Sequence, residues 1–136
     1  MKTLSVLLIE DDMIETMKFN RVLNSLELKH KVTEATNGEE ALKILKDKNR
    51  IPDLILLDLN MPKMNGKELL KILKDDPVLR YIPAIILSTS NNHQDIKECY
   101  EIGVAGYIMK PLKYEEYTQK IKNLLSYWSV SELIKG

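Results

Sequence analysis

The chain has 136 residues, with 20 Lys and Arg residues against 20 Asp and Glu residues and a formal net charge of zero at pH 7. This length suits one domain with a buried core, and the balanced charge provides no net field for nucleic acid or an anionic membrane, so we expect neither as a partner. The first apolar run is much shorter than a membrane span and the single cysteine excludes an internal disulfide, which together indicate a cytoplasmic protein.

The first third of the chain predicts strands and helices in alternation. Residues 4–9 are almost wholly apolar and lead directly into the acidic run at residues 10–12, which indicates a buried strand that ends in acid. A helix with an apolar stripe is expected next, and residues 31–36 then alternate like an edge strand with one wetter face. Asn37 and Glu40 have the spacing of a helix cap, so a second helix is expected from there.

The central strand is expected at residues 54–57, an apolar run without polar alternation that is bounded by Pro52 and Asn60. Such a run is typical of a strand covered on both faces inside a parallel sheet. It ends on Asp58, and ligand sites in open parallel sheets gather at the carboxyl ends of the strands. Asp58 is therefore the first candidate for chemistry, and Asn65 is expected to cap the helix that follows.

Two more strands are expected in the rest of the chain. Residues 84–87 predict the fourth strand, which finishes at Ser88. A helix follows and is expected to stop at Gly103, where a left-handed backbone conformation suits glycine. Residues 104–109 predict the fifth strand, which ends at Lys110.

The last helix is expected to carry an apolar and aromatic stripe that ends near Trp128. We assign residues 1–128 to one domain and residues 129–136 to an extension of this helix or a tail. Because Trp and Tyr are enriched at protein interfaces, the C-terminal helix is a candidate surface for a homodimer. Only this helix is expected after Lys110, so we expect no DNA-binding or enzymatic output domain.

Five strands alternating with five helices predict an α/β fold with a doubly wound parallel sheet. Right-handed crossovers and a polar second strand favour the flavodoxin-like order 2-1-3-4-5. In that order strands one, three, four and five end beside one another. The acids at residues 10–12, Asp58, Ser88 and Lys110 would then converge on one crevice.

The residue types at this crevice favour phosphoryl chemistry with a metal. Clustered carboxylates repel one another unless they are protonated or a cation neutralises them, and oxygen ligands of this kind select a hard divalent ion, best matched by Mg²⁺. Asp58 would be a nucleophile towards phosphorus, and Lys110 would be a fixed cation for the anionic transition state. Ser88 is placed to donate a hydrogen bond to a phosphoryl oxygen.

Over residues 5–128 the chain resembles the response-regulator receiver domain of two-component signalling. The matching segments are LLIEDD, LILLDLNMPKMNG, ILSTS and AGYIMKP, in that order along the chain. The resemblance implies that Asp58 accepts a phosphoryl group from a sensor histidine kinase or a phosphotransfer protein. It further implies a single-domain response regulator that signals to a downstream protein target and is not a turnover enzyme.

The resemblance also implies a particular set of metal ligands. Mg²⁺ would be bound by Asp11, Asp58 and the main-chain carbonyl oxygen of Asn60. The family usually has an acidic pair after the first strand, whereas three acids stand here. An acid followed by Asp directly after the apolar run favours Glu10 and Asp11, with Asp12 in reserve beside the ligands.

The resemblance implies a conformational switch as well. Lys110 would contact the phosphoryl group, while Ser88 and Tyr107 would form the switch pair. The hydroxyl residue would swing towards the phosphate and the aromatic residue would turn inward, remodelling the face made by the fourth helix, fifth strand and fifth helix. Whether the bond between Lys110 and Pro111 is cis or trans stays open at this point.

Three other functions are weighed against this hypothesis. A phosphatase of the haloacid-dehalogenase type also uses a strand-end Asp, but it needs a second Asp two residues on, where Asn60 stands. A flavodoxin-like FMN binder is disfavoured because the acids at residues 10–12 would repel the phosphate. A receiver-like module that binds proteins without phosphorylation is weakened by the presence of both Asp58 and Lys110.

Overall fold

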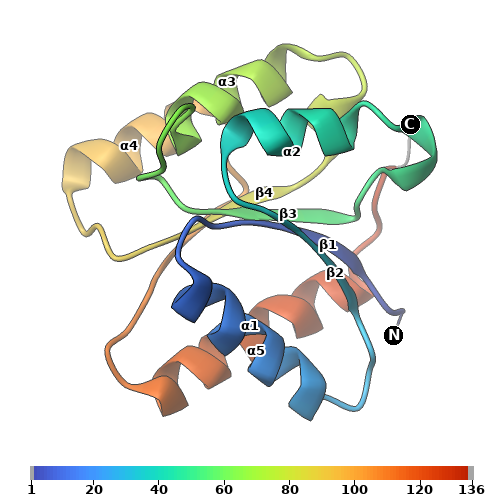
Figure 1. Cartoon of the computed structure of the whole chain (residues 1–136), viewed down its shortest axis with the longest axis vertical. Helices are drawn as coiled ribbons and strands as arrows, with labels where there is room; N and C mark the ends of the chain where they lie inside the picture. Colours follow the sequence, from blue (N-terminus) through green and yellow to red (C-terminus); the bar gives the residue numbers. More distant parts are fainter. Residues whose placement is uncertain (1, 135–136) are drawn as a thin grey trace.

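A five-stranded sheet separates two layers of helices in the computed structural model, which describes residues 2–134 (Figure 1). The strands are β1 (Ser5–Ile9), β2 (Lys31–Ala35), β3 (Leu54–Leu57), β4 (Ala84–Ser88) and β5 (Gly106–Met109). The helices are α1 (Met13–Ser25), α2 (Gly38–Leu45), α3 (Gly66–Asp75), α4 (His93–Ile102) and α5 (Tyr114–Val130), with short 3₁₀ helices η1 (Lys48–Arg50) and η2 (Leu79–Tyr81). Helices α1 and α5 cover one face of the sheet, and α2, α3 and α4 cover the other.

The strand order is β2-β1-β3-β4-β5 and all neighbouring pairs are parallel, which confirms the predicted topology. Every residue of β3 is buried, as expected for an apolar run inside a parallel sheet. In β2 only Ala35 is buried, which fits its place at the edge. The ends of β1, β3, β4 and β5 therefore lie along one edge of the sheet.

Two hydrophobic cores form because side chains along a strand alternate between the two faces of the sheet. In β3, Ile55 and Leu57 join the core under α2, α3 and α4, while Leu54 and Leu56 join the core under α1 and α5. Tyr117 of α5 is the largest fully buried side chain and lies in the second core. Both faces of the sheet are thus apolar, and polar side chains gather at its carboxyl edge.

The helix ends form largely as the sequence indicates. Asn37 and Asn65 cap α2 and α3, each accepting a hydrogen bond on its side-chain oxygen from the amide three residues on. Gly103 ends α4 with φ of 121°, which a residue with a Cβ rarely adopts. The fifth strand begins later than predicted, at Gly106, because the amide of Val104 still bonds to Cys99 at the end of α4.

Among residues 2–134, none of the helices combines the length and the apolar character that crossing a bilayer requires.

His30 contributes to the attachment of the first strand to the loop before β2. Its Nδ1 atom accepts a hydrogen bond of 2.9 Å from the amide of Leu4, so the neutral imidazole is the form that binds. Burial lowers the pKa of His30 below its ordinary value of 6.5. A folded-state pKa below the unfolded one means that this contribution is complete above the unfolded pKa and is lost as the pH falls through the folded pKa.

We therefore expect acidification from about pH 7.5 to about pH 5.5 to lower the melting temperature of the wild-type chain more than that of a His30→Asn variant. The Asn side-chain oxygen accepts the same hydrogen bond without titrating. Thermal unfolding followed by circular dichroism at both pH values measures the difference. An equal fall in the two proteins would contradict this role of His30.

Candidate functional site

The carboxyl edge of the sheet brings together three carboxylates, those of Glu10, Asp11 and Asp58. One oxygen from each lies within 4.8 Å of the others. Backbone hydrogen bonds place them, because the Asp58 amide donates to Ile9 O at 3.2 Å and the Glu10 amide donates to Ala35 O at 2.9 Å. The predicted convergence of the strand-one acids with Asp58 is thus seen in the structure, and the donor set fits a hard divalent cation.

Asp12, the third acid of the triplet, caps a helix instead of joining the three carboxylates. It is the N-cap of α1, and its Oδ1 accepts a hydrogen bond of 2.9 Å from the Ile14 amide. Its own amide donates to Glu10 Oε2 at 3.2 Å. The structure therefore brings Glu10 and Asp11, rather than Asp12, up to Asp58.

Lys110 lies among these acids with a side chain that is only 6% exposed. Its amide donates to Ser88 O at 2.8 Å, which fixes the backbone at the end of β5. Its Nζ atom is 2.5 Å from Glu10 Oε1 and 3.8 Å from Glu15 Oε2. Glu15 was not singled out from the sequence, although it stands in the first turn of the helix that follows the acidic run.

Burial and Lys110 shift the pKa values of Asp58 and Glu10 in opposite directions. Burial raises the pKa of Asp58, while the charge of Lys110 and the backbone hydrogen bonds to Asp58, including one of 2.8 Å from the Leu59 amide, limit the rise. Burial likewise raises the pKa of Glu10 against its hydrogen bond to Lys110. Burial alone would lower the pKa of Lys110, but the hydrogen bond to Glu10 and the surrounding carboxylates outweigh it and raise that pKa.

Ser88 and Tyr107 meet at a third residue, Ser90, in the loop after β4. The Ser88 side chain is fully buried, and its Oγ accepts a hydrogen bond of 3.1 Å from the Ser90 amide. The half-buried Tyr107 donates its hydroxyl hydrogen to Ser90 O at 2.9 Å. The two predicted switch residues therefore contact the same short segment.

A polar network missed by the sequence analysis continues from Ser90 to the neighbouring helices. The Ser90 hydroxyl donates to Asp95 Oδ2 at 2.9 Å, and Lys67 of α3 contacts Asp95 at 2.7 Å and Glu98 at 2.6 Å. The hydrogen bonds from Lys67 to Asp95 and Glu98 raise the pKa of the lysine. This network connects α3 to the start of α4 next to the acidic site. Lys67 is far from Asp95 and Glu98 in the sequence, so no local sequence pattern predicts their contact.

Asn60, whose carbonyl oxygen is a predicted ligand, lies exposed in the loop after β3. It lines a small cavity of about 110 Å³ together with Asn65, Lys67 and Asp95. Among the described residues there is no cis peptide bond, so the bond between Lys110 and Pro111 is trans.

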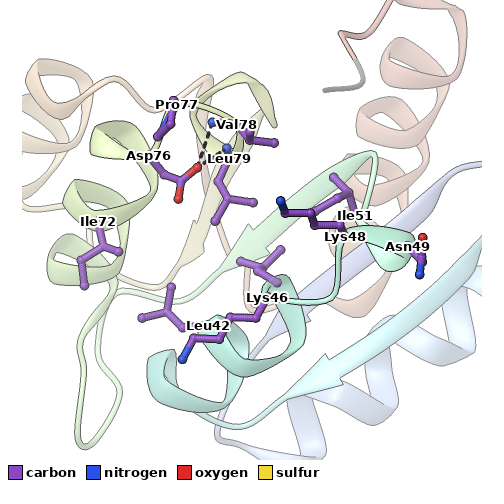
Figure 2. A pocket seen from close by; sticks show the side chains of 11 residues that line it. Leu42, Lys46, Lys48, Asn49, Ile51, Ile72, Asp76, Pro77, Val78 and Leu79 are labelled. Atoms are coloured by element: carbon purple, nitrogen blue, oxygen red, sulfur yellow. Dashed lines mark hydrogen bonds between the residues drawn. The ribbon is translucent and has the colours of Figure 1, made fainter.

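A larger and mostly apolar hollow of about 890 Å³ lies elsewhere, between α2 with η1 and α3 with η2 (Figure 2). Leu42, Ile51, Ile72 and Leu79 line it, and Asp76 beside them accepts hydrogen bonds from the amides of Val78 and Leu79 (Figure 2). Ile51 and Leu79 precede β3 and β4, so the hollow is at the amino ends of these strands. None of the carboxylates grouped with Asp58 lines it.

The comparison with protein families agrees with this geometry, since residues 6–122 match the model described as the response regulator receiver domain. The chain belongs to the response regulator receiver family. Receiver domains typically act in signalling by two-component systems rather than as metabolic enzymes.

Relatives of the receiver cover nearly its whole length. Response regulator Rcp1 from Synechocystis is 31% identical over 128 residues, covering 90% of this chain and 87% of the relative. The crystal structure of the phosphorylated cyanobacterial phytochrome response regulator RcpA is 34% identical, has a TM-score of 0.90, and covers 96% of this chain and 98% of its own. The crystal structure of Rcp1 in its Mn²⁺-bound form is 30% identical and has a TM-score of 0.88. The match covers 98% of this chain and 99% of the Rcp1 chain.

Gly66 holds the loop of the receiver close to Asp58. Its amide donates to Leu59 O at 2.9 Å, and a Cβ at this position would lie 2.6 Å from Asp58 O and 2.9 Å from Leu59 Cα. Both atoms belong to the backbone, so the loop itself would have to move. A Cβ at Gly106 would meet only Ile85 side-chain atoms at 3.6 and 3.8 Å, which are ordinary contacts.

We expect Gly66→Ala to lower the free energy of unfolding by about 1–3 kcal/mol because of this overlap. The matched variant Gly106→Ala should lose much less. Urea unfolding measures the free energy of unfolding of the two variants. An equal decrease in both would contradict the expectation, because it would mean that the loop after β3 accommodates the Cβ without a specific loss of stability.

Proposed function

We propose that this receiver accepts a phosphoryl group on Asp58 from a sensor histidine kinase or a phosphotransfer protein and then signals through a changed protein-binding surface. The observation that carries the proposal is the grouping of the Asp58, Glu10 and Asp11 carboxylates around a buried lysine at one edge of the sheet. Because such a donor acts in the cytoplasm, we place the protein there. It would act as a signalling domain rather than as a turnover enzyme.

The carboxylates support Mg²⁺ as the metal. Asp11, Asp58 and the main-chain oxygen of Asn60 would hold it, with Glu10 beside them, and the Mn²⁺-bound form of Rcp1 supports a divalent ion at such a site. When bound, the ion supplies positive charge that offsets the negative charge developing on the transferring phosphoryl group.

The side chains of this chain would divide the remaining work. A carboxylate oxygen of Asp58 forms the new bond to phosphorus while the phosphorus–nitrogen bond of the donor phosphohistidine breaks, and the electron pair of that bond stays on the imidazole nitrogen. The amide of Leu59, 2.8 Å from Asp58 Oδ1, holds the carboxylate in its orientation. Lys110 would then bind a phosphoryl oxygen in place of Glu10.

Ser88 and Tyr107 would transmit the change. The Ser88 hydroxyl accepts a hydrogen bond from the Ser90 amide, which leaves its own hydrogen available for a phosphoryl oxygen. Movement of Ser88 would disturb the segment at Ser90, to which Tyr107 and Asp95 are bonded. The face of α4, β5 and α5 is thus the proposed surface for a downstream protein target.

The surface around the site supports a protein as phosphodonor. Met13, Ile14 and Met17 of α1 are 77%, 68% and 61% exposed, directly after the acidic run. Clustered exposed apolar side chains mark protein interaction surfaces, whereas a small phosphodonor needs none.

Intact mass after incubation with acetyl phosphate and Mg²⁺ tests the proposal. We expect one phosphoryl adduct on the wild-type chain and none on Asp58→Asn or in the presence of a chelator. Asp12→Asn is the matched control, because Asn keeps the helix cap while one neighbouring charge is removed, and it should still form the adduct.

Two outcomes would replace the proposal. No adduct on the wild-type chain even after long incubation would favour a receiver-like module that binds proteins without phosphorylation. Rapid consumption of acetyl phosphate without an accumulating adduct would favour an aspartyl-phosphate phosphatase.

We also propose that the C-terminal helix forms a homodimer. Helix α5 continues to Val130, and Tyr127, Val130 and Ile134 are all exposed on or just after its last turns. We propose residues 1–128 as the receiver and residues 129–136 as an extension of this helix and tail; residues 135–136 lie outside the described residues.

A Tyr127→Glu/Val130→Glu variant is expected to be monomeric at concentrations where the wild-type chain dimerises, because two charges would be buried at the interface. Light scattering coupled to gel filtration measures the mass. Tyr81→Glu, which changes an exposed tyrosine in η2, is the control and should dimerise. A monomeric wild-type chain at high concentration would refute the dimer.

A further inference from the structure

Glu15 is an acid beside the site to which the proposed chemistry assigns no role. It lies in the first turn of α1, and its Oε2 atom is shielded from solvent without a hydrogen-bond partner among the described residues. That atom points towards Lys110, with 3.8 Å between Oε2 and Nζ. A shielded carboxylate oxygen without a hydrogen bond costs free energy, so its persistence here requires a compensating attraction, which the ammonium group supplies.

The ammonium group of Lys110 lies on the α1 side of the site. Its ion pairs within 4.0 Å, among the described residues, are with Glu10 at 2.5 Å and Glu15 at 3.8 Å, and Asp58 is not among them. The charge of Asp58 nevertheless acts on Lys110, since it contributes to the raised pKa of the lysine. Three carboxylates therefore compete for one ammonium group, and two of them draw it away from Asp58.

We propose that Glu15 is a positioning residue that holds Lys110 on the α1 side and thereby restrains the lysine from binding a phosphoryl group on Asp58. The proposal rests on the proposed function, because it concerns the same site. Lys110 must leave Glu15 as well as Glu10 to bind a phosphoryl oxygen. Glu15 thus favours the unphosphorylated form of the receiver over the phosphorylated one.

A second cation keeps Glu15 in place when the lysine moves. Lys18, one turn further along α1, has its Nζ atom 3.5 Å from Glu15 Oε1 and also 4.7 Å from the centre of the Tyr117 ring. Glu15 is therefore attached to α1 through its other oxygen. Its Oε2 remains available to Lys110 in the unphosphorylated form.

Beryllium fluoride, a reversible mimic of the phosphoryl group on a carboxylate, provides an equilibrium test in the presence of Mg²⁺. We expect Glu15→Gln to bind it about two- to fivefold more tightly than the wild-type chain, a size suited to a partly exposed ion pair. Glu15→Met should change the affinity in the same direction. Glu27→Gln, which removes one charge from an exposed position after α1, should leave it unchanged.

The same comparison in a Lys110→Met background separates positioning from a general effect of charge. If Glu15 acts through the lysine, Glu15→Gln changes nothing there. The same tightening in that background would overturn the proposal, as would an unchanged affinity of Glu15→Gln in the wild-type background. Thermal unfolding of each variant verifies that it is folded.

The position of Lys110 is a readout that needs no ligand. In a crystal structure of Glu15→Gln we expect its Nζ atom to move away from residue 15 towards Asp58, and an unmoved ammonium group would overturn the proposal. If the wild-type chain neither binds beryllium fluoride nor forms a phosphoryl adduct, the proposed function fails. The crystal structure then still decides the role of Glu15.

Discussion

The balance of charge around Lys110 is the constraint on which the site depends. Three carboxylates, those of Glu10, Glu15 and Asp58, act on one ammonium group that is almost fully buried. An unpaired charge in a buried environment raises the free energy of the folded state, so each acid needs Lys110, a backbone amide or a metal ion as a partner. A site held in this way responds strongly when a further negative group arrives, because the lysine has alternative partners within a short distance.

The parallel sheet holds these charged side chains close together. Its apolar interior supplies the burial, and its backbone hydrogen bonds place the polar residues that follow each strand, as between Asp58 and Ile9 or Lys110 and Ser88. The loops add connections outward. From Ser88 the path runs through the segment at Ser90 to Asp95 and thus to α4, so a change at the sheet edge has a physical route to a helix surface.

Much of the architecture follows from local pattern. Apolar runs and caps predicted all five strands to within two residues at either end, and the topology rules predicted their order. The late start of β5 was missed because Val104 is apolar like a strand residue while its amide completes the end of α4. The contacts of Glu15 with Lys110 and of Lys67 with Asp95 and Glu98 were missed because these partners lie far away in sequence, and local patterns carry no information on such pairs.

The sequence by itself determined the fold class, the family and the meeting of the strand-one acids, Asp58 and Lys110 at one edge of the sheet, because hydrophobic periodicity sets the strands and a parallel sheet aligns their carboxyl ends. Only the tertiary structure decided which acids of the triplet face Asp58, where Asp12 turns to cap α1, and which carboxylates hold Lys110. The physical reason is that side-chain direction and burial at the site depend on how the start of α1 and the end of β5 meet in the folded chain. No short stretch of the chain contains both.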